Sequence, residues 1–485
     1  MRIVSQAIRS GNNNGYERGL QEAQRGLERA IAAQLAADAS FAEREQAVLS
    51  AANEMCRRLL EAELQATADG HPDRVRIEGI AYGRHQEGAV TYHSLCGPLT
   101  LTVRRATYRE VGEHNGPTAV ALDLAAGLIE GATPALAYRV ALGYAQGPGR
   151  HAEEQMHADH RQPPSRRTLE RLAKAIGTAV TRTASRVEPL VRAAETLPEG
   201  ARGVSVGIDR TTVPMEEERL AGSPPDTRRK RRTAPYVRAV PPRVDVKYRM
   251  AYVGTVSIVE ASGEALVTRR YAITGDDEPT DLVTRMMADV QRAREQAPRV
   301  RVGVIQDAAP ELWTLLRDGL RAEARLRQWD EGIDRYHLNE RLAEILRITE
   351  PEATRRTSQL ARWNDALDQD DVAIDRIARW VAEQISAYEG DDLATLERHW
   401  TFLCNNNDRM RYATLRAKGL PCGSGATEGA CKSVVMIRAK ACGQRWHHEG
   451  VSAVLTLRAA YLSERLPTMW SHFADDYSAE IQAAA

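Results

Sequence analysis

The sequence predicts a multidomain α/β protein, in which a mixed-sheet core follows helical and small β segments. Three observations support this. The chain has 485 residues, more than one ordinary domain holds and enough for several compact units. Between Gly203 and His337, short runs that alternate apolar and polar or small residues are separated by runs of helical period. On both sides of that region, apolar residues recur mainly at helical spacing.

Charge and hydropathy exclude several classes of protein. The formal net charge is zero, so no global basic field points to a partner. The positive charge is concentrated locally, and most of it is arginine, which suits bidentate contact with phosphates. No apolar run reaches membrane-spanning length, and the first residues lack the continuous apolar stretch of a secretory signal. We therefore expect a cytoplasmic protein without a membrane partner.

The cysteines predict neither a disulfide framework nor a usual zinc site. Six cysteines are scattered along the chain, and none forms a CxxC pair. Cys422, Cys431, Cys442 and His447 could be argued as a metal site, but their spacing matches no usual ligand pattern. Buried or half-buried free thiols are the favoured interpretation.

The N-terminal part is expected to hold a helical hairpin and then a small β segment. Residues 16–68 have helical period, with a break near Asp38-Ala39-Ser40, and Gly70-His71-Pro72 ends the second helix. The hairpin could pair two subunits or pack on its own chain. Residues 73–110 then change period, and we expect strands on either side of a turn at Gly97-Pro98.

A segment in the next helical region resembles a helix-turn-helix. A helix is expected over residues 151–160, a turn over residues 161–164, and a second helix capped by Ser165. The second helix carries four cations that could contact DNA: Arg166, Arg167, Arg171 and Lys174. Any amphipathic helix after Pro-Pro-Ser would look similar.

Two strands of the core are each expected to end in an aspartate. Val204, Val206 and Ile208 alternate with small or polar residues up to Asp209. A hairpin over residues 250–260 and 265–273 and a helix over residues 280–296 follow. Strand residues 300–306 then lead to Asp307, and a helix over residues 309–327 leads to a short strand over residues 332–337, which contains Asp334 and His337.

The C-terminal part is expected to begin with a helical insertion. Trp363, Trp380 and Trp400 are its expected core anchors, and residues 405–408 are an expected loop. After the insertion, Ser424 is placed to cap a helix with Glu428 in its first turn, where the helix dipole favours a carboxylate. At α-helical spacing Glu428 shares a face with residues that include two cations: Cys431, Lys432, Val435 and Arg438. The chain past Trp470 is expected to fray.

The order of the acids suggests a chemistry. Asp209, Asp307 and Glu428 are each expected at the end of an element of one α/β core. Two-metal phosphoryl transfer needs such carboxylates, because hard oxygen ligands hold two divalent cations about 3.5–4 Å apart. Each aspartate alone would more often be a cap or turn residue. No Gly-rich phosphate loop or nucleophile elbow is present in the sequence as a competing motif.

Three motifs together carry a resemblance to a known family over roughly residues 200 to 470. They are residues 206–216, which contain Asp209, residues 306–313, which contain Asp307, and the run from Gly423 through Glu428 with Lys432, Arg438, Lys440 and Gly443-Gln444-Arg445-Trp446. This part of the chain resembles the DDE transposases of bacterial insertion sequences, closest to the ISKra-type group. Their catalytic domain has a ribonuclease H-like fold.

The resemblance implies an activity and its parts. Asp209, Asp307 and Glu428 would bind Mg²⁺, which Mn²⁺ could replace, and the enzyme would cut and join DNA at element ends. The run from Asp334 to His337 is similar to an Asp-x-x-His signature of related transposases, so Asp334, His337 and Lys432 would support the site. One signature of another transposase group is absent, because Pro421, Ser424 and Val435 stand where its Tyr, Arg and Lys would be. A mechanism through DNA-end hairpins is therefore not expected.

The expected partners are the terminal inverted repeats, target DNA and further copies of the chain, as a homo-oligomer on DNA. The cations expected to contact DNA, besides the four of the helix-turn-helix, are Arg228, Arg229, Lys230, Arg231, Arg232, Arg438 and Lys440. A transposase-derived DNA-binding protein and a metal-dependent nuclease without strand transfer are the alternatives. The expected segments are a helical hairpin (1–70), a small β segment (71–117), a helical DNA-binding region (118–200), the catalytic domain (201–337 with 421–470), the helical insertion (338–420) and a tail (471–485).

Overall fold

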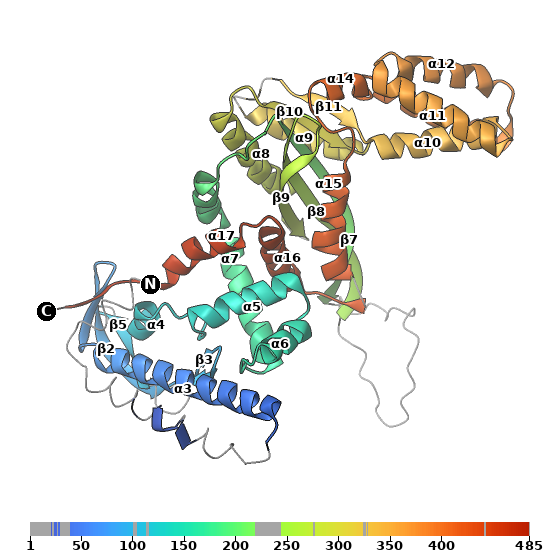
Figure 1. The fold of residues 1–485 in the computed structure, drawn as a ribbon. Helices are drawn as coiled ribbons and strands as arrows, with labels where there is room; N and C mark the ends of the chain where they lie inside the picture. Colours follow the sequence, from blue (N-terminus) through green and yellow to red (C-terminus); the bar gives the residue numbers. More distant parts are fainter. Residues whose placement is uncertain are drawn as a thin grey trace. The chain divides into compact units, whose positions relative to one another are not determined.

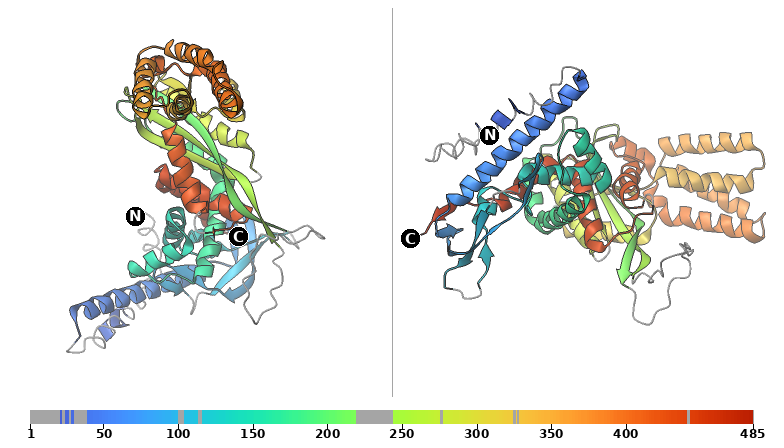
Figure 2. Two further views of the ribbon diagram at one scale, coloured as in Figure 1. Left: turned by 90° about the vertical axis from the view of Figure 1, so that its right-hand side faces the viewer. Right: turned by 90° about the horizontal axis from the view of Figure 1, so that it is seen from below.

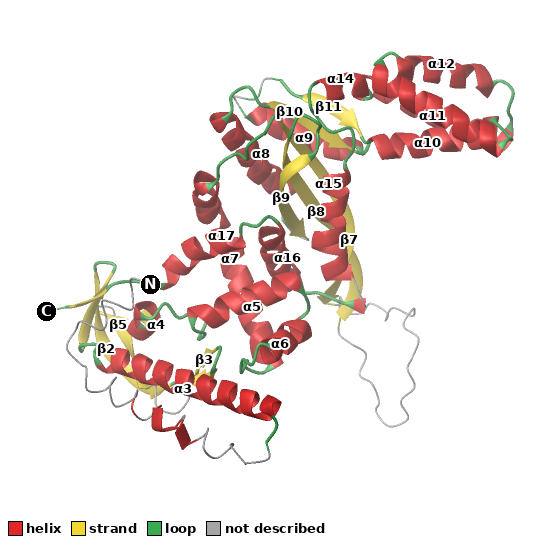
Figure 3. Ribbon diagram, viewed as in Figure 1, coloured by secondary structure: helices red, strands yellow, loops and turns green. Residues whose placement is uncertain are grey.

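The chain forms two compact units of mixed α and β structure (Figure 3). The computed structural model describes residues 21, 24–26, 28–29, 39–99, 104–112, 116–218, 244–274, 277–323, 326, 328–440 and 443–484. Unit 1 combines Met1–Glu188 with Leu466–Ala485, and unit 2 is Pro189–Arg465. Among the described helices, none is both long enough and apolar enough to cross a membrane.

Unit 1 contains a five-stranded antiparallel sheet in the order β12-β1-β2-β5-β6 and a small hairpin. The strands are β1 (Arg74–Ile77), β2 (Ile80–Ala89), β5 (Arg104–Glu110), β6 (Thr118–Ala119) and β12 (Ile481–Ala483), with β3 (Tyr92–Ser94) and β4 (Gly97–Leu99) in the hairpin. The small β segment expected near residues 73–110 is therefore present. The turn expected at Gly97-Pro98 is wrong, because both residues pair within the hairpin strand β4.

Two helices of unit 1 begin at recognisable sequence signals. Helix α3 (Phe41–Asp69) starts after Ser40, whose side chain forms a capping box with Glu43. Helix α5 (Pro134–Gln146) has a proline in its first turn, where the missing N–H costs nothing. The remaining helices are α4 (Ala121–Ala125), α6 (Gly149–Ala158), α7 (Arg166–Ala194), which continues into unit 2 from Pro189, α17 (Leu466–Ala474) and the short 3-10 helix η4 (Asp475–Tyr477). The second helix of the expected hairpin is thus confirmed as α3, whereas most of its first helix lies outside the described residues.

The segment after Trp470 was expected to fray, but it is ordered as the end of α17, η4 and β12. Phe473 in α17 is buried, and its ring lies 5.2 Å from the ring of Trp470. Strand β12 then pairs with β1 at the edge of the unit 1 sheet. Apolar burial and a sheet ladder thus hold this segment, and the chain passes from unit 2 to unit 1 at Leu466 rather than at the expected residue 470.

Unit 2 is built on a five-stranded mixed sheet in the order β11-β10-β7-β8-β9. Its strands are β7 (Gly203–Glu218), β8 (Val244–Val259), β9 (Ala265–Thr274), β10 (Arg301–Gln306) and β11 (Asp330–Ile333). The pairs β7 with β8 and β8 with β9 are antiparallel, whereas β10 runs parallel to β7 and to β11. The core strands expected from the alternating pattern are therefore present, with β7 and β8 longer than expected.

Helices cover both faces of this sheet, as Figure 1 shows. Helices α8 (Pro279–Gln296) and α9 (Pro310–Ala322) pack on one face, where Leu282, Met286 and Leu316 are fully buried. The other face is covered by α15 (Gly425–Ala430), the π-helix η2 (Cys431–Lys440) and α16 (His448–Leu462). The apolar side chains of both faces form the core that fixes the sheet.

The predicted helical insertion lies between β11 and α15. It consists of α10 (Arg335–Thr349), α11 (Ala353–Gln369), α12 (Ala373–Ile385) and α13 (Gly390–Asn406), which Figure 2 shows side by side, followed by the 3-10 helix η1 (Asn407–Arg409) and α14 (Tyr412–Ala417). Trp363 and Trp380 pack edge to face at 5.1 Å, as core anchors should. Two details were wrong: Trp400 is 37% exposed, and the expected loop at residues 405–408 is the end of α13 and the start of η1.

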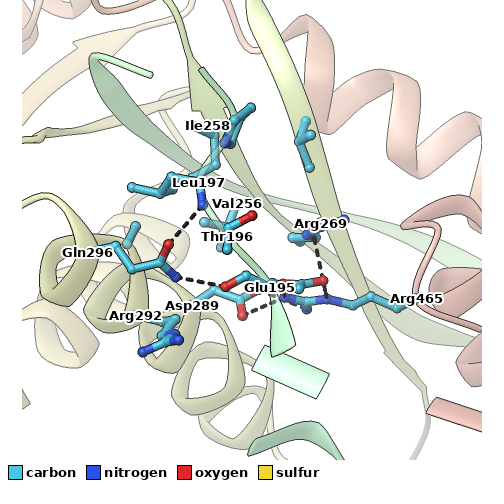
Figure 4. A pocket seen from close by; sticks show the side chains of 13 residues that line it. Glu195, Thr196, Leu197, Val256, Ile258, Arg269, Asp289, Arg292, Gln296 and Arg465 are labelled. Atoms are coloured by element: carbon cyan, nitrogen blue, oxygen red, sulfur yellow. Dashed lines mark hydrogen bonds and ion pairs between the residues drawn. The ribbon is translucent and has the colours of Figure 1, made fainter. Parts of the chain in front are cut away.

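A buried ion network fastens the two ends of unit 2 to its core. Arg465 donates to both carboxylate oxygens of Glu195, at 2.9 and 2.7 Å, and to Asp289 of α8, at 3.0 and 2.8 Å. The hydroxyl of Tyr271 in β9 also donates to Asp289 at 2.6 Å. Figure 4 shows Arg465, Glu195 and Asp289 around a cavity of about 40 Å³, together with Gln296, whose side-chain amide donates to the backbone carbonyl oxygen of Glu195. The segment entering unit 2 and the segment leaving it are therefore tied to the same helix.

Candidate active site

Asp209 lies on the face of the sheet that α15 covers. It belongs to the middle of β7, not to its end as expected, because the residues that follow, among them the β-branched Thr211, Thr212 and Val213, continue the ladder with β8 as far as Glu218. The neighbouring strand β10 ends at Gln306, which leaves the flank of β7 open beyond that point. The backbone N–H of Arg210 donates to Oδ1 of Asp209 at 2.7 Å.

A glycine and a threonine allow α15 to approach β7 closely. A Cβ atom built on Gly207 would overlap the hydroxyl of Thr427 and lie 3.0 Å from the carbonyl oxygen of Ile305. Thr427 is buried, and its Oγ1 is 2.7 Å from Oγ1 of Thr255 in β8. This contact fixes the height of α15 above the sheet, and with it the position of Glu428.

Asp307 directly follows β10 and is held by the turn into α9. Its Oδ1 accepts the backbone N–H of Ala309 at 3.0 Å, and its carbonyl oxygen accepts the indole N–H of Trp313 at 2.7 Å. Trp313 is itself fully buried. The strand-end position expected for Asp307 is therefore confirmed, and the buried indole fixes its backbone.

Asp334 was expected within a short strand, and this expectation is wrong. It caps the N-terminus of α10 instead. Strand β11 ends at Ile333, and Oδ2 of Asp334 accepts the backbone N–H of His337 at 2.9 Å. The same oxygen lies 2.9 Å from Nδ1 of His337, and Oδ1 accepts the N–H of Ser424 at 2.5 Å. Asp334 is only 1% exposed, and its hydrogen bonds link α10 to the loop before α15.

Glu428 is positioned by its own helix and faces two cationic or polar groups. Oε1 accepts the hydroxyl of Ser424 at 3.1 Å, so this serine orients the carboxylate rather than capping the helix with its side chain. Nδ1 of His337 lies 3.9 Å from Oε1, and Nζ of Lys432 lies 3.9 Å from Oε2. The carboxylate is partly exposed.

The three predicted acids line one cavity. Asp209, Asp307 and Glu428 come from β7, from the loop after β10 and from α15, and they share a cavity of about 220 Å³. Its other lining residues include the expected supporting residues His337 and Lys432, together with Ile208, Gln306, Ser424, Thr427, Cys431 and Met436. Several water molecules of about 30 Å³ each, or a phosphate group and a hydrated cation, would fit this volume.

The donor set of this cavity suits a hard divalent cation. Three carboxylates offer the oxygen ligands that Mg²⁺ and Mn²⁺ prefer. In the described part of the chain, the one set of three or more His, Cys, Asp or Glu side chains whose ligand atoms all lie within 4.8 Å of one another is Asp334, His337 and Glu428. The Asp334 carboxylate already accepts three hydrogen bonds, which favours a structural link between α10 and α15 over metal binding. Cation binding among the three predicted acids therefore requires the Asp209 and Asp307 carboxylates to close on Glu428.

The cysteine alternative is not supported where the structure describes it. Burial, and next the Asp209 carboxylate, raises the pKa of the Cys431 thiol to about 12. Burial also raises the pKa of Cys422. Metals bind the thiolate form, so both sulfurs are poor ligands at neutral pH. Cys442 lies outside the described residues.

The cations around the cavity differ in access. Lys432 is exposed, and Lys440 donates from Nζ to Oγ1 of Thr211 on β7 at 2.9 Å. Arg438, expected to contact DNA, is instead buried and stacks 4.9 Å from the ring centre of Trp446. The expectation assumed α-helical spacing, whereas the π-helix η2 winds differently and turns Arg438 inward.

The other predicted DNA contacts lie elsewhere. In unit 1, helices α6 and α7 and the turn between them form as expected, and Arg167, Arg171 and Lys174 are exposed on α7. Arg166 is engaged with Glu153 of α6 at 2.7 Å. The basic run Arg228, Arg229, Lys230, Arg231 and Arg232 lies outside the described residues.

Three residues of the site were missed by sequence reasoning. Gly207 and Thr427 stand inside the quoted motifs, but a threonine contacting a glycine of another motif leaves no periodic signal. Gln306 lines the cavity and is buried, and neither polar atom of its amide has a partner in the described structure. A buried unpaired amide costs about 1–3 kcal/mol, which a bound ligand could offset.

No protein-family model matches this chain, and no curated protein matches it. The geometry and chemistry of the cavity therefore carry the functional conclusion.

Proposed function

We propose that this protein is a DDE-type transposase, which uses divalent cations to cut DNA at element ends and to join the freed 3′-hydroxyl to target DNA. One observation carries the proposal: Asp209, Asp307 and Glu428, far apart in the sequence, line a single cavity. Carboxylates gathered in an open, partly polar cavity are the ligand set that two-metal phosphoryl transfer uses.

The topology around the cavity supports this proposal. In the order of the chain, the first three strands of unit 2 form an antiparallel meander, and the next two are added parallel to the first. This is the arrangement expected of a ribonuclease H-like catalytic domain. A helical insertion precedes the helix with the final acid, as the resemblance described above implies.

Asp209, Asp307 and Glu428 would hold the cations. When bound, two Mg²⁺ ions would activate the attacking oxygen and stabilise the leaving oxygen of a phosphodiester. Two residues of the chain act on the Glu428 carboxylate. The Ser424 hydroxyl orients it by a hydrogen bond, and Lys432 places a positive charge beside it. His337, whose Nδ1 lies 2.9 Å from Asp334, is held with its side chain lining the cavity.

The α6–α7 segment of unit 1 is our candidate for reading element-end DNA. Its three exposed cations, Arg167, Arg171 and Lys174, lie along the first turns of α7. Replacing all three by alanine in the full chain should remove the preference for terminal-repeat duplex over scrambled duplex in a competition assay. A variant that keeps the preference would move recognition to another segment. Assembly of several copies on DNA is part of the proposal, since joining needs two element ends.

The deciding experiment exchanges the acids for their amides. Asp209→Asn, Asp307→Asn and Glu428→Gln keep side-chain shape but remove the charge that binds Mg²⁺, so cleavage of end-labelled DNA should fall by several orders of magnitude while DNA binding persists. Mn²⁺ should restore the wild-type reaction after chelation. Equal cleavage by wild type and Glu428→Gln would refute the proposal. Product analysis separates a nuclease, which leaves only cut ends, from a transposase, which also joins them.

A further inference from the structure

Unit 2 has a second large hollow, at the end of the sheet opposite to the acids. Its volume is about 670 Å³, roughly three times that of the cavity with the acids. The loop before β10, the first residues of β10 and the segment leading into β11 line it. Asp307 follows the other end of β10, and Asp334 follows the other end of β11.

The hollow is strongly basic. Arg294 at the end of α8, Arg299 and Arg301 all line it. Arg299 and Arg301 are exposed, and the structure records no ion pair of the three guanidinium groups with any residue it describes. Lys418 also lines the hollow, but Asp330 neutralises it. The three arginines therefore leave a local excess of positive charge.

One wall of the hollow is rigid. Trp329 packs against the apolar core, and its indole N–H donates to Glu331 at 3.1 Å. Arg301 is fixed at its backbone, because β10 pairs with β7 at this residue. Guanidinium groups on a fixed strand lose less freedom on binding and match phosphate oxygens bidentately.

We infer that this hollow binds the phosphodiester backbone of DNA at a distance from the cut. The inference rests on the proposed function, in that DNA is the polyanion already held at the acids. A strand rises about 3.3 Å per residue, so the length of β10 separates Arg301 from Asp307 by roughly 20 Å. DNA must pass around the surface rather than along the buried strand, so at about 3.4 Å per base pair the contacts fall at least about six base pairs from the scissile phosphate. Phosphate contacts position DNA without reading its sequence.

The test is the salt dependence of DNA binding by the full-length protein. Arg294, Arg299 and Arg301 are replaced together by alanine, and affinity for a fluorescent 30-base-pair duplex of arbitrary sequence is measured from about 50 to 200 mM salt. Three lost phosphate contacts at about 0.9 each lower the log–log slope by about 2.7, so wild type should lose roughly 40-fold more affinity than the variant over this range.

A matched control replaces three exposed arginines of unit 2 that already have carboxylate partners: Arg321 with Asp318, Arg355 with Glu352, and Arg376 with Asp370. This control should keep the wild-type slope. An unchanged slope in the hollow variant overturns the inference, whether or not the acids cut DNA. Tight binding of ATP by wild type, lost in the variant without a change in slope, would also overturn it, because the hollow would then be a mononucleotide site.

Discussion

A single methyl group at Gly207 should impair catalysis although it touches no acid. The added Cβ atom would overlap the hydroxyl of Thr427 and lie 3.0 Å from the carbonyl oxygen of Ile305. Since nonbonded heavy atoms settle at about 3.5–4.0 Å, α15 must move away from the sheet by on the order of 1 Å. Glu428 follows Thr427 directly and moves with it.

The expected size of the effect follows from this displacement. A misplacement of about 1 Å can lower a rate by roughly 100-fold, and overpacking of this kind costs about 1–3 kcal/mol of stability. Gly207→Ala should therefore cut end-labelled DNA about 100-fold more slowly than wild type in single-turnover assays, while thermal unfolding confirms that it still folds.

Two further variants make the test specific. Gly429→Ala is the matched control, because a Cβ atom at this position of the same helix meets no atom within 4 Å. Its cleavage rate should equal that of wild type. Adding Thr427→Ala to Gly207→Ala removes the overlapping hydroxyl and should restore part of the rate. Cleavage by Gly207→Ala at the wild-type rate would refute the claim that the Gly207–Thr427 contact positions Glu428.

Three other perturbations have defined outcomes. Asp334→Asn should lower the free energy of unfolding by several kcal/mol, because an amide cannot accept all three hydrogen bonds of this buried carboxylate, at about 1–3 kcal/mol each. An unchanged urea midpoint would contradict the structural role of Asp334. Arg465→Met should cost up to about 3–5 kcal/mol, because it removes the buried guanidinium that pairs with Asp289 and Glu195 and leaves the Tyr271 hydroxyl and Arg269 as weaker remaining partners, and urea unfolding measures this loss. The hydrogen bond from Arg57 lowers the pKa of Glu54 to about 2 from 4.5. Its contribution to the free energy of unfolding, no more than about 1 kcal/mol at this partly exposed site, is therefore full above pH 4.5 and lost toward pH 2. Glu54→Gln should flatten the fall of the melting temperature between pH 4.5 and 3, and an equal fall in both proteins would argue against this pair.

Alternation of apolar and polar residues was enough to predict the strands that carry Asp209 and lead to Asp307. The grouping of these two acids with Glu428 in one site was an implication of the family resemblance. The helix with Glu428 was recognisable from its glycines and helical spacing. These parts depend on local pattern, which a single sequence records.

The remaining features depend on contacts between distant segments. Asp209 was expected at a strand end because aspartate favours turns, yet the partner strand β8 continues the ladder past it. Asp334 was expected within a strand, whereas it caps α10 and accepts a hydrogen bond from Ser424, which is 90 residues away in the sequence. Arg438 is buried rather than exposed because Cys431–Lys440 forms a π-helix, and no residue pattern in this segment predicts a π-helix.

The Arg465 network has a consequence for the order in which the protein folds. Unit 1 is discontinuous, since β12 must return to pair with β1 after the whole of unit 2 has been made. Closing so long a loop in a flexible chain costs on the order of 5 kcal/mol. Once unit 2 has folded, the bonds from Arg465 to Glu195 hold its first and last segments together. The loop is then already closed, so we expect unit 2 to fold first and the β1–β12 ladder to form last.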